Sequence, residues 1–138
     1  MPNLLFNDNW MQQFAKLWNN DQEINDALDG QNFNANIGYG FTQGQHPVGI
    51  LMIEHGKAKY GGFYEGQNLD WDLRANDDDW KYWITEGLGL AKLGFVVSCK
   101  QLYFNSGDFH KILRTPRLAT AFLRSFNVMN KVTVKHQV

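Results

Sequence analysis

The chain has 138 residues, of which 43% are hydrophobic and 20% charged, and its formal net charge is −1 at pH 7. This length suits one domain whose core needs no disulfide or metal ion, and the near-zero charge excludes a global field that would attract nucleic acid. The single cysteine, Cys99, excludes an intramolecular disulfide, and we expect a buried, small apolar side chain there. No apolar run approaches the roughly 20 residues that span a bilayer, so we expect a cytoplasmic protein.

Large apolar side chains recur at helical spacing near the N-terminus. Trp10, Phe14 and Trp18 lie on one face of a helix predicted over residues 7–29. The polar run at 19–21 predicts a break that would divide this segment into two helices. We therefore expect a helical region before the first strand.

The apolar period then changes to two, which predicts a series of strands. His55 and Gly56 fit a tight hairpin loop, after which Ala58 and Tyr60 would share one face of the next strand. The glycine pair at 61–62 predicts a bulge or a close approach by another element. The strands are expected within residues 36–42, 48–54, 57–65 and 69–75.

The last of these strands carries two aspartates. Trp71 and Leu73 point to one face, and Asp70 and Asp72 point to the other. We expect a half-buried strand whose two carboxylates face solvent, which argues against a catalytic pair of acids.

The aspartates at 77–79 follow at the start of a predicted helix. Asn76 or the next residue would cap this helix, and acids in its first turn favour the helix dipole. Trp80, Trp83 and Ile84 then form its buried stripe. No metal ion is required to explain these acids, because the segment lacks the alternating ligands and central glycine of an EF-hand loop.

In the C-terminal part, the sequence predicts a short helix near 90–98 and a strand within 100–108. A further helical segment follows, and Pro116 marks either a break in it or the first turn of a new helix. The residues from about 131 to 138 are expected to form a loose tail. One apolar face of the last helix is made by Leu118, Phe122, Phe126 and Met129.

Charge is unevenly distributed along the chain. After Asp108 there is no acidic residue, and six basic residues give this part a charge of +6. Arg117 and Arg124 lie away from the apolar face of the last helix, as in basic amphipathic helices that meet a membrane surface or a partner groove. An ordinary surface helix is the alternative.

The sequence contains no recognisable catalytic or cofactor motif. The histidines do not pair at metal-ligand spacing, and we expect them to be solvated loop residues. Neither a nucleophile elbow, nor a P-loop, nor a dinucleotide fingerprint is present. We therefore expect neither an enzyme nor a nucleic-acid-binding protein, and we expect no metal ion or cofactor.

The second half of the chain carries a family resemblance. A strand ("LDWDLRA"), an acid-capped helix ("NDDDWKYWITEG"), a short helix, a strand ending at Gly107 ("LYFNSGD") and a closing amphipathic helix resemble the sterol carrier protein 2 family over residues 69–126. The longer segment at 108–116 is similar to free-standing bacterial members, and the chain ends "HQV" rather than in a peroxisomal tripeptide. The order of elements fits this family along nearly the whole chain.

The resemblance implies a single α+β domain over 1–138. It would contain one mixed five-stranded sheet, helices over one face and an apolar cavity between the two layers. It implies a non-enzymatic carrier for a sterol-like, fatty-acyl or isoprenoid ligand, and we expect a monomer or homodimer. From the basic charge beside the apolar face of the last helix, we hypothesise that Arg117 and Arg124 dock on anionic membrane and that this opens the cavity. Residues expected to line the cavity are Trp71, Trp80, Trp83, Ile84, Phe95, Leu118, Phe122 and Phe126.

Two alternatives stay open. Any of these aromatic side chains could simply fill the core, which would leave no cavity. The same fold could also serve an accessory or scaffold protein that presents a lipophilic substrate, such as a quinone precursor, to enzymes. A small enzyme acting on a lipophilic substrate is disfavoured, because no acid, base and nucleophile converge in the sequence.

Overall fold

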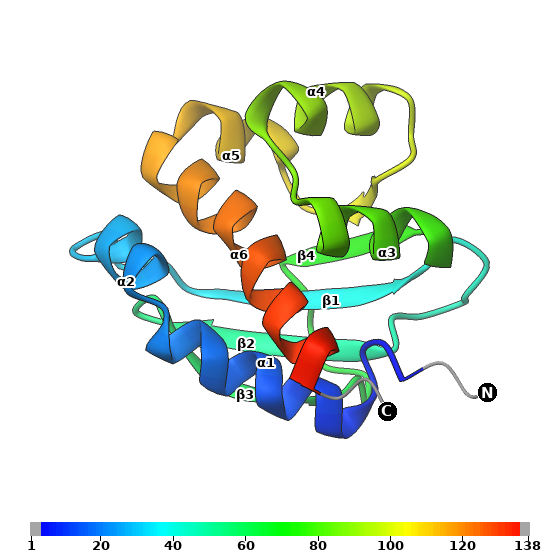
Figure 1. Cartoon of the computed structure of the whole chain (residues 1–138), viewed down its shortest axis with the longest axis horizontal. Coiled ribbons are helices and arrows are strands. Elements are labelled where there is room, and N and C mark those ends of the chain that lie inside the picture. The colour runs from blue at the N-terminus through cyan, green and yellow to red at the C-terminus, as the bar shows by residue number, and fades with distance from the viewer. Residues whose placement is uncertain (1–3, 136–138) are drawn as a thin grey trace.

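The computed structural model describes residues 4–135, which form one sheet and a layer of helices (Figure 1). The predicted order of helices and strands is confirmed. In chain order the elements are α1 (Asp8–Asn20), α2 (Gln22–Leu28), β1 (Ala35–Phe41), β2 (Gly49–Glu54), β3 (Lys57–Phe63), β4 (Trp71–Ala75), α3 (Asp77–Glu86), α4 (Leu90–Ser98), β5 (Tyr103–Ser106), α5 (Phe109–Arg114) and α6 (Pro116–Lys135).

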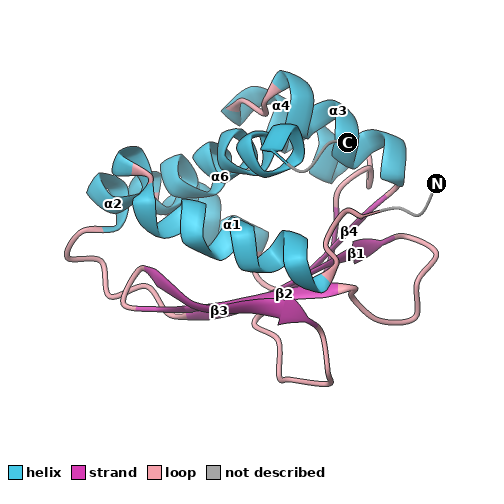
Figure 2. Ribbon diagram, turned by 60° about the horizontal axis from the view of Figure 1, so that its bottom comes forward, coloured by secondary structure: helices cyan, strands magenta, loops and turns pink. Residues whose placement is uncertain are grey.

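The sheet has five strands in the order β3-β2-β1-β4-β5. β1 and β4 are parallel, and every other neighbouring pair is antiparallel. Figure 2 shows the helices on one face of this sheet. The predicted α+β class, with a mixed five-stranded sheet covered on one face, is therefore confirmed.

The predicted break in the N-terminal helix lies at Asp21. Its carboxylate accepts a hydrogen bond from the backbone N–H of Ile24 at 3.1 Å, so that Asp21 ends α1 and caps α2. Just before it, the Asn19 side chain bonds both the N–H and the carbonyl of Ala58 on β3. This amide pairs the backbone of an edge strand that would otherwise be open.

The predicted close approach at the glycine pair is confirmed at Gly61, where α1 lies directly on β3. A Cβ atom there would stand 2.9 Å from the carbonyl carbon of Met11, overlap its oxygen and reach within 3.1 Å of the Ala15 methyl. Real Cβ atoms essentially never lie within 3.0 Å of such backbone atoms, and the distance to the Ala15 methyl is also unusually short. Glycine at 61 therefore sets how closely the first helix packs on the sheet.

Replacing Gly61 with alanine is expected to lower the free energy of unfolding by about 2 kcal/mol, because α1 must move outward. Gly94→Ala is the matched control, since a Cβ there meets nothing within 4 Å and alanine favours the helix, so it should raise stability slightly. Urea unfolding followed by tryptophan fluorescence measures both variants. Equal stability of Gly61→Ala and the wild type would contradict the close packing.

The predicted facing of Tyr60 is wrong. Between Met52 and Ile53 the pairing with β3 shifts, so that Met52 opposes Tyr60 while Ile53 opposes Ala58. The extra residue of this bulge reverses the alternation of faces. Ala58 is therefore buried under α1, whereas Tyr60 is 41% exposed.

Two further predictions are corrected. Cys99 is exposed, because it caps the C-terminal end of α4, beyond the residues with which that helix packs inward. The expected loose tail is wrong for residues 131–135, which continue α6, whereas 136–138 lie outside the described residues.

The hairpin at His55 and Gly56 is confirmed, with φ values of 51° and 79°.

Candidate functional site

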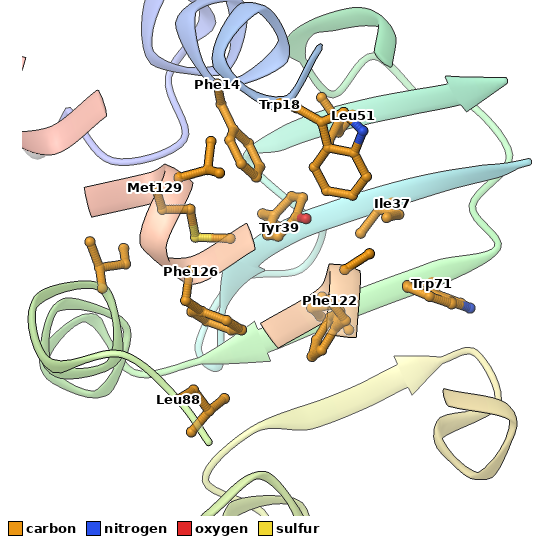
Figure 3. Packing of buried hydrophobic residues seen from close by; sticks show 14 of the residues in the cluster. Phe14, Trp18, Ile37, Tyr39, Leu51, Trp71, Leu88, Phe122, Phe126 and Met129 are labelled. Carbon is orange, nitrogen blue, oxygen red and sulfur yellow. The ribbon is translucent and has the colours of Figure 1, made fainter. Parts of the chain in front are cut away.

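The apolar interior lies between the inner face of the sheet and the helices α1, α3 and α6 (Figure 3). Strand alternation and helical periodicity send their large side chains into this space from opposite sides. The structure buries seven of the eight residues that the sequence analysis assigned to a cavity. They are Trp71, Trp80, Trp83, Ile84, Leu118, Phe122 and Phe126.

The aromatic rings of this interior contact one another. Trp80 of α3 stands at its centre, with ring-centroid distances of 5.0 Å to Phe6, 5.7 Å to Trp83 and 6.2 Å to Phe126. Nearer to β5, Phe122 of α6 meets the Trp71 ring edge-on at 6.0 Å. These side chains therefore fill the space that they share, as in an ordinary aromatic core.

Trp80 is also held by a hydrogen bond. Its indole N–H donates to the carbonyl of Gly40 on β1 at 2.8 Å, which ties α3 to the centre of the sheet. The neighbouring rings of α6 therefore pack against a fixed surface. A molecule entering this interior would have to part α6 from α3 and the sheet.

Tyr39 carries a polar group into this apolar interior. The side chain is 1% exposed and packs against Phe6 at 5.3 Å and Phe14 at 5.8 Å between ring centroids. Burial raises the pKa of the Tyr39 hydroxyl above its ordinary value. Among residues 4–132 this hydroxyl has no hydrogen-bond partner. A buried tyrosine hydroxyl usually has one, so this group is an unsatisfied polar atom among the described side chains.

No role for Tyr39 follows from the sequence. The alternation of Ile37, Tyr39 and Phe41 predicts which face the side chain takes. It contains no information on whether a partner reaches the hydroxyl. That depends on the helices that pack over β1.

Phe95, the eighth predicted cavity residue, lies outside the interior. It is 54% exposed, whereas its neighbours Leu93 and Val96 are the residues that α4 buries. Because a helix turns by about 100° per residue, Phe95 stands on the other side of α4 from the face that these two define. The prediction that it lines the cavity is wrong for this arrangement.

The two arginines predicted to meet a membrane contact α2 and the residues that flank it. Arg124 donates from Nη2 and Nε to the Asp21 carboxylate at 2.9 and 3.1 Å. Arg117 donates to the backbone carbonyls of Asp26 and Asp29. These contacts hold α6 on α2, while Arg117 itself stays exposed, so membrane docking through α6 remains a prediction.

The Asp21 carboxylate is nearly enclosed at this junction. Burial by itself would raise its pKa, but the hydrogen bonds from Arg124 and from the Ile24 backbone, with the charge of Arg124, outweigh burial. The pKa of Asp21 is therefore below its ordinary value. The charged form is the one that the folded chain stabilises.

The outer face of the sheet holds a second buried ion pair, which corrects the prediction for Asp72. Arg74 donates from Nε and Nη2 to the Asp72 carboxylate at 2.6 and 2.9 Å, and both side chains are buried. The loop at 42–47 folds over this face, where the Gly44 carbonyl accepts a third bond from Arg74. Asp70, by contrast, is exposed as predicted.

A polar surface pocket lies elsewhere, between the end of α2 and the β2–β3 turn. Its polar side chains bond to each other: Lys57 donates to Asn25 Oδ1 at 2.7 Å, and His55 Nδ1 contacts Asn32 Oδ1. Over residues 4–135, no group of three or more histidine, cysteine or acidic side chains is placed to hold a metal ion. Nor is any helix of this described part both long and apolar enough to cross a membrane.

The chain has a sterol carrier protein 2-like fold. A crystal structure of sterol carrier protein 2 superposes with a TM-score of 0.72 at 16% identity, covering 92% of this chain and 98% of the other. A conserved hypothetical protein of Thermus thermophilus, for which a sterol carrier assignment was suggested, gives the same TM-score and identity over 93% and 89%. No family model matches the sequence. The search of curated proteins found no match either.

Proposed function

We propose that this protein binds a lipid without catalysing a reaction. The ligand is of sterol-like, fatty-acyl or isoprenoid type, held between the sheet and α6. The observation that carries the proposal is the sterol carrier protein 2-like fold enclosing an apolar interior in which the Tyr39 hydroxyl has no partner among residues 4–132.

The apolar side chains supply the affinity in this proposal. Each 100 Å² of ligand surface removed from water contributes about 2.5 kcal/mol, so a long chain or ring system gains enough to separate packed helices. The ligand enters where Phe122 and Phe126 of α6 part from Trp71 and Trp80, and it takes the place of these aromatic contacts. A resting interior filled by aromatic rings also keeps water out when no ligand is bound.

Tyr39 supplies the polar contact. Its hydroxyl donates to an oxygen of the ligand, such as a sterol hydroxyl, an acyl carbonyl or a quinone carbonyl. A hydrocarbon without oxygen gains nothing from this group. The proposed site therefore favours lipids that carry one polar end into the interior.

The first test is to purify the protein gently, record native mass spectra and extract bound lipid after denaturation. We expect a co-purified lipid in near-stoichiometric amount. If the protein is bare, and if its tryptophan fluorescence stays unchanged on titration with fatty acid, sterol and quinone analogues, the proposal is wrong. A ligand that binds but is never released to acceptor vesicles would favour the accessory protein that presents a lipophilic substrate to enzymes.

Tyr39→Phe tests the polar contact. We expect roughly two- to tenfold weaker binding of a fatty alcohol or sterol, and unchanged binding of an oxygen-free hydrocarbon of similar size. The ligand-free variant should be as stable as the wild type or more so, because an unpaired buried hydroxyl has been removed. Tyr60→Phe, at an exposed tyrosine, is the matched control. Equal losses for both ligand types would contradict the role of the hydroxyl.

A further inference from the structure

The short helix α4 is apolar on both of its sides. It packs inward through Leu93 and Val96, while Leu90 and Phe95 are 55% and 54% exposed. Between these two exposed side chains the outward face carries small residues, including Gly94. A surface helix normally turns polar residues to solvent, so an apolar outer face indicates a second apolar environment.

Charge around α4 has the opposite sign to most of the chain. The segment at 87–107 contains Lys92 and Lys100 and no acidic residue. Lys92 Nζ lies 5.6 Å from the centre of the Phe95 ring, so a cation accompanies this exposed apolar side chain. Residues 1–86 hold thirteen acidic and five basic side chains. Residues 108–138 hold one acidic and six basic side chains, so an anionic surface would attract the molecule at α4 and at this C-terminal part and repel much of residues 1–86.

The position of α4 leaves its outer face accessible. Figures 1 and 2 both place α4 at the margin of the helix layer, above α3 and away from α1 and β3. Its exposed fractions show that no other described part of the chain covers Leu90 or Phe95. A flat surface can approach this margin without meeting the sheet.

We propose that α4 docks the protein on an anionic phospholipid bilayer. Leu90 and Phe95 enter the boundary between headgroups and acyl chains, and Lys92 and Lys100 contact the lipid phosphates. This surface is distinct from the arginines of α6, of which Arg124 is paired with Asp21. Docking needs no ligand in the interior, so it goes beyond the proposed lipid binding and can be tested separately.

Cys99 provides a direct probe of docking. It is the only cysteine of the sequence and is exposed at the end of α4, so an environment-sensitive fluorophore attached to it reports contact with lipid. We expect a blue shift and increased emission with vesicles of phosphatidylcholine and phosphatidylglycerol, little change with phosphatidylcholine alone, and weaker binding at high salt. Co-sedimentation of unlabelled protein with the same vesicles excludes an effect of the label.

The variants separate the apolar from the charged contribution. Leu90→Gln with Phe95→Gln should lower the vesicle partition coefficient at least about tenfold, since two exposed apolar groups no longer enter the bilayer. Lys92→Gln and Lys100→Gln should each lower it roughly fivefold and reduce its dependence on salt. Phe63→Gln is the matched control, because Phe63 is 48% exposed and lies on β3, the edge strand opposite β5. Vesicle binding by this variant should be unchanged.

Three outcomes would overturn the proposal. The wild type could fail to bind anionic vesicles, or the protein with both Leu90→Gln and Phe95→Gln could bind them as well as the wild type. The third is that Phe63→Gln weakens vesicle binding as much as the α4 replacements do. Self-association that buries Cys99 without vesicle binding would assign the surface to a second copy of the chain instead. Ligand binding is followed separately by tryptophan fluorescence. Failure of docking is therefore distinguishable from failure of the lipid-binding proposal.

Discussion

Replacing Arg124 with alanine is expected to lower the free energy of unfolding by about 3 kcal/mol at pH 7. Asp21 would keep a buried carboxylate that has lost its two-point contact with the guanidinium. The remaining cation, Lys131, lies 3.8 Å from the carboxylate on an exposed side chain and compensates little. The loss should appear as a lower urea midpoint measured by circular dichroism.

The pH dependence of this loss follows from the pKa of Asp21, which is depressed in the folded chain. A depressed carboxyl pKa contributes stability above the pKa of the unfolded state, and this contribution disappears as the pH falls through the folded value. The difference between wild type and Arg124→Ala should therefore be fully present at neutral pH and shrink below about pH 4. A difference that grows with acidification would contradict the assigned pair.

Lys81→Ala is the matched control for Arg124→Ala. Lys81 pairs with Asp77 at 2.8 Å, but both side chains are largely in solvent, so its removal should cost less than about 1 kcal/mol. The Arg124 change also bears on the proposed function, because the lost contact joins α6 to α2. If α6 moves to admit a ligand, ligand exchange in the Arg124→Ala protein should be faster than in the Lys81→Ala protein.

Replacing Asp72 with alanine is expected to lower the free energy of unfolding by about 3–5 kcal/mol, because the buried guanidinium of Arg74 loses its carboxylate. Asn105, which donates to the same carboxylate at 3.0 Å, loses an acceptor as well. Urea unfolding of Asp72→Ala, of Arg74→Ala and of the protein with both replacements measures the coupling free energy between Asp72 and Arg74.

The double replacement Asp72→Val with Arg74→Met distinguishes an unpaired charge from a general loss of packing. Apolar side chains that fill the same space leave no charge buried, so this protein should regain most of the stability lost in Asp72→Ala. Asp70→Ala, at the exposed aspartate of the same segment, should change stability far less. If Asp72→Ala lowers the free energy of unfolding as little as Asp70→Ala does, the buried pair contributes little to stability.

The local periodicity of the sequence predicted the elements well. Alternation identified the strands that carry Tyr39 and Trp71, and helical spacing identified the faces of Trp80 and Phe126. The break before Asp21 was visible because polar residues interrupt an apolar period. These features depend on neighbours in the chain, which a sequence displays directly.

The environment of each polar side chain was not predictable in this way. Asp72 alternates with apolar residues as a solvent-facing aspartate would, yet the loop at 42–47 folds over it and buries it against Arg74. Arg124 has the spacing of a free cation on an amphipathic helix, but its partner Asp21 is 103 residues away in the chain. In both cases the deciding contact comes from a distant segment.

The sequence by itself determined the α+β class, the order of elements and the apolar faces that meet in the interior, because these follow from periods of two and 3.6 residues. Only the tertiary structure decided that the interior rings contact one another, that no described side chain pairs with the Tyr39 hydroxyl and that Phe95 faces solvent. The physical reason is that burial and pairing depend on which surfaces pack together. That packing is settled by contacts across the whole fold rather than by the residues on either side.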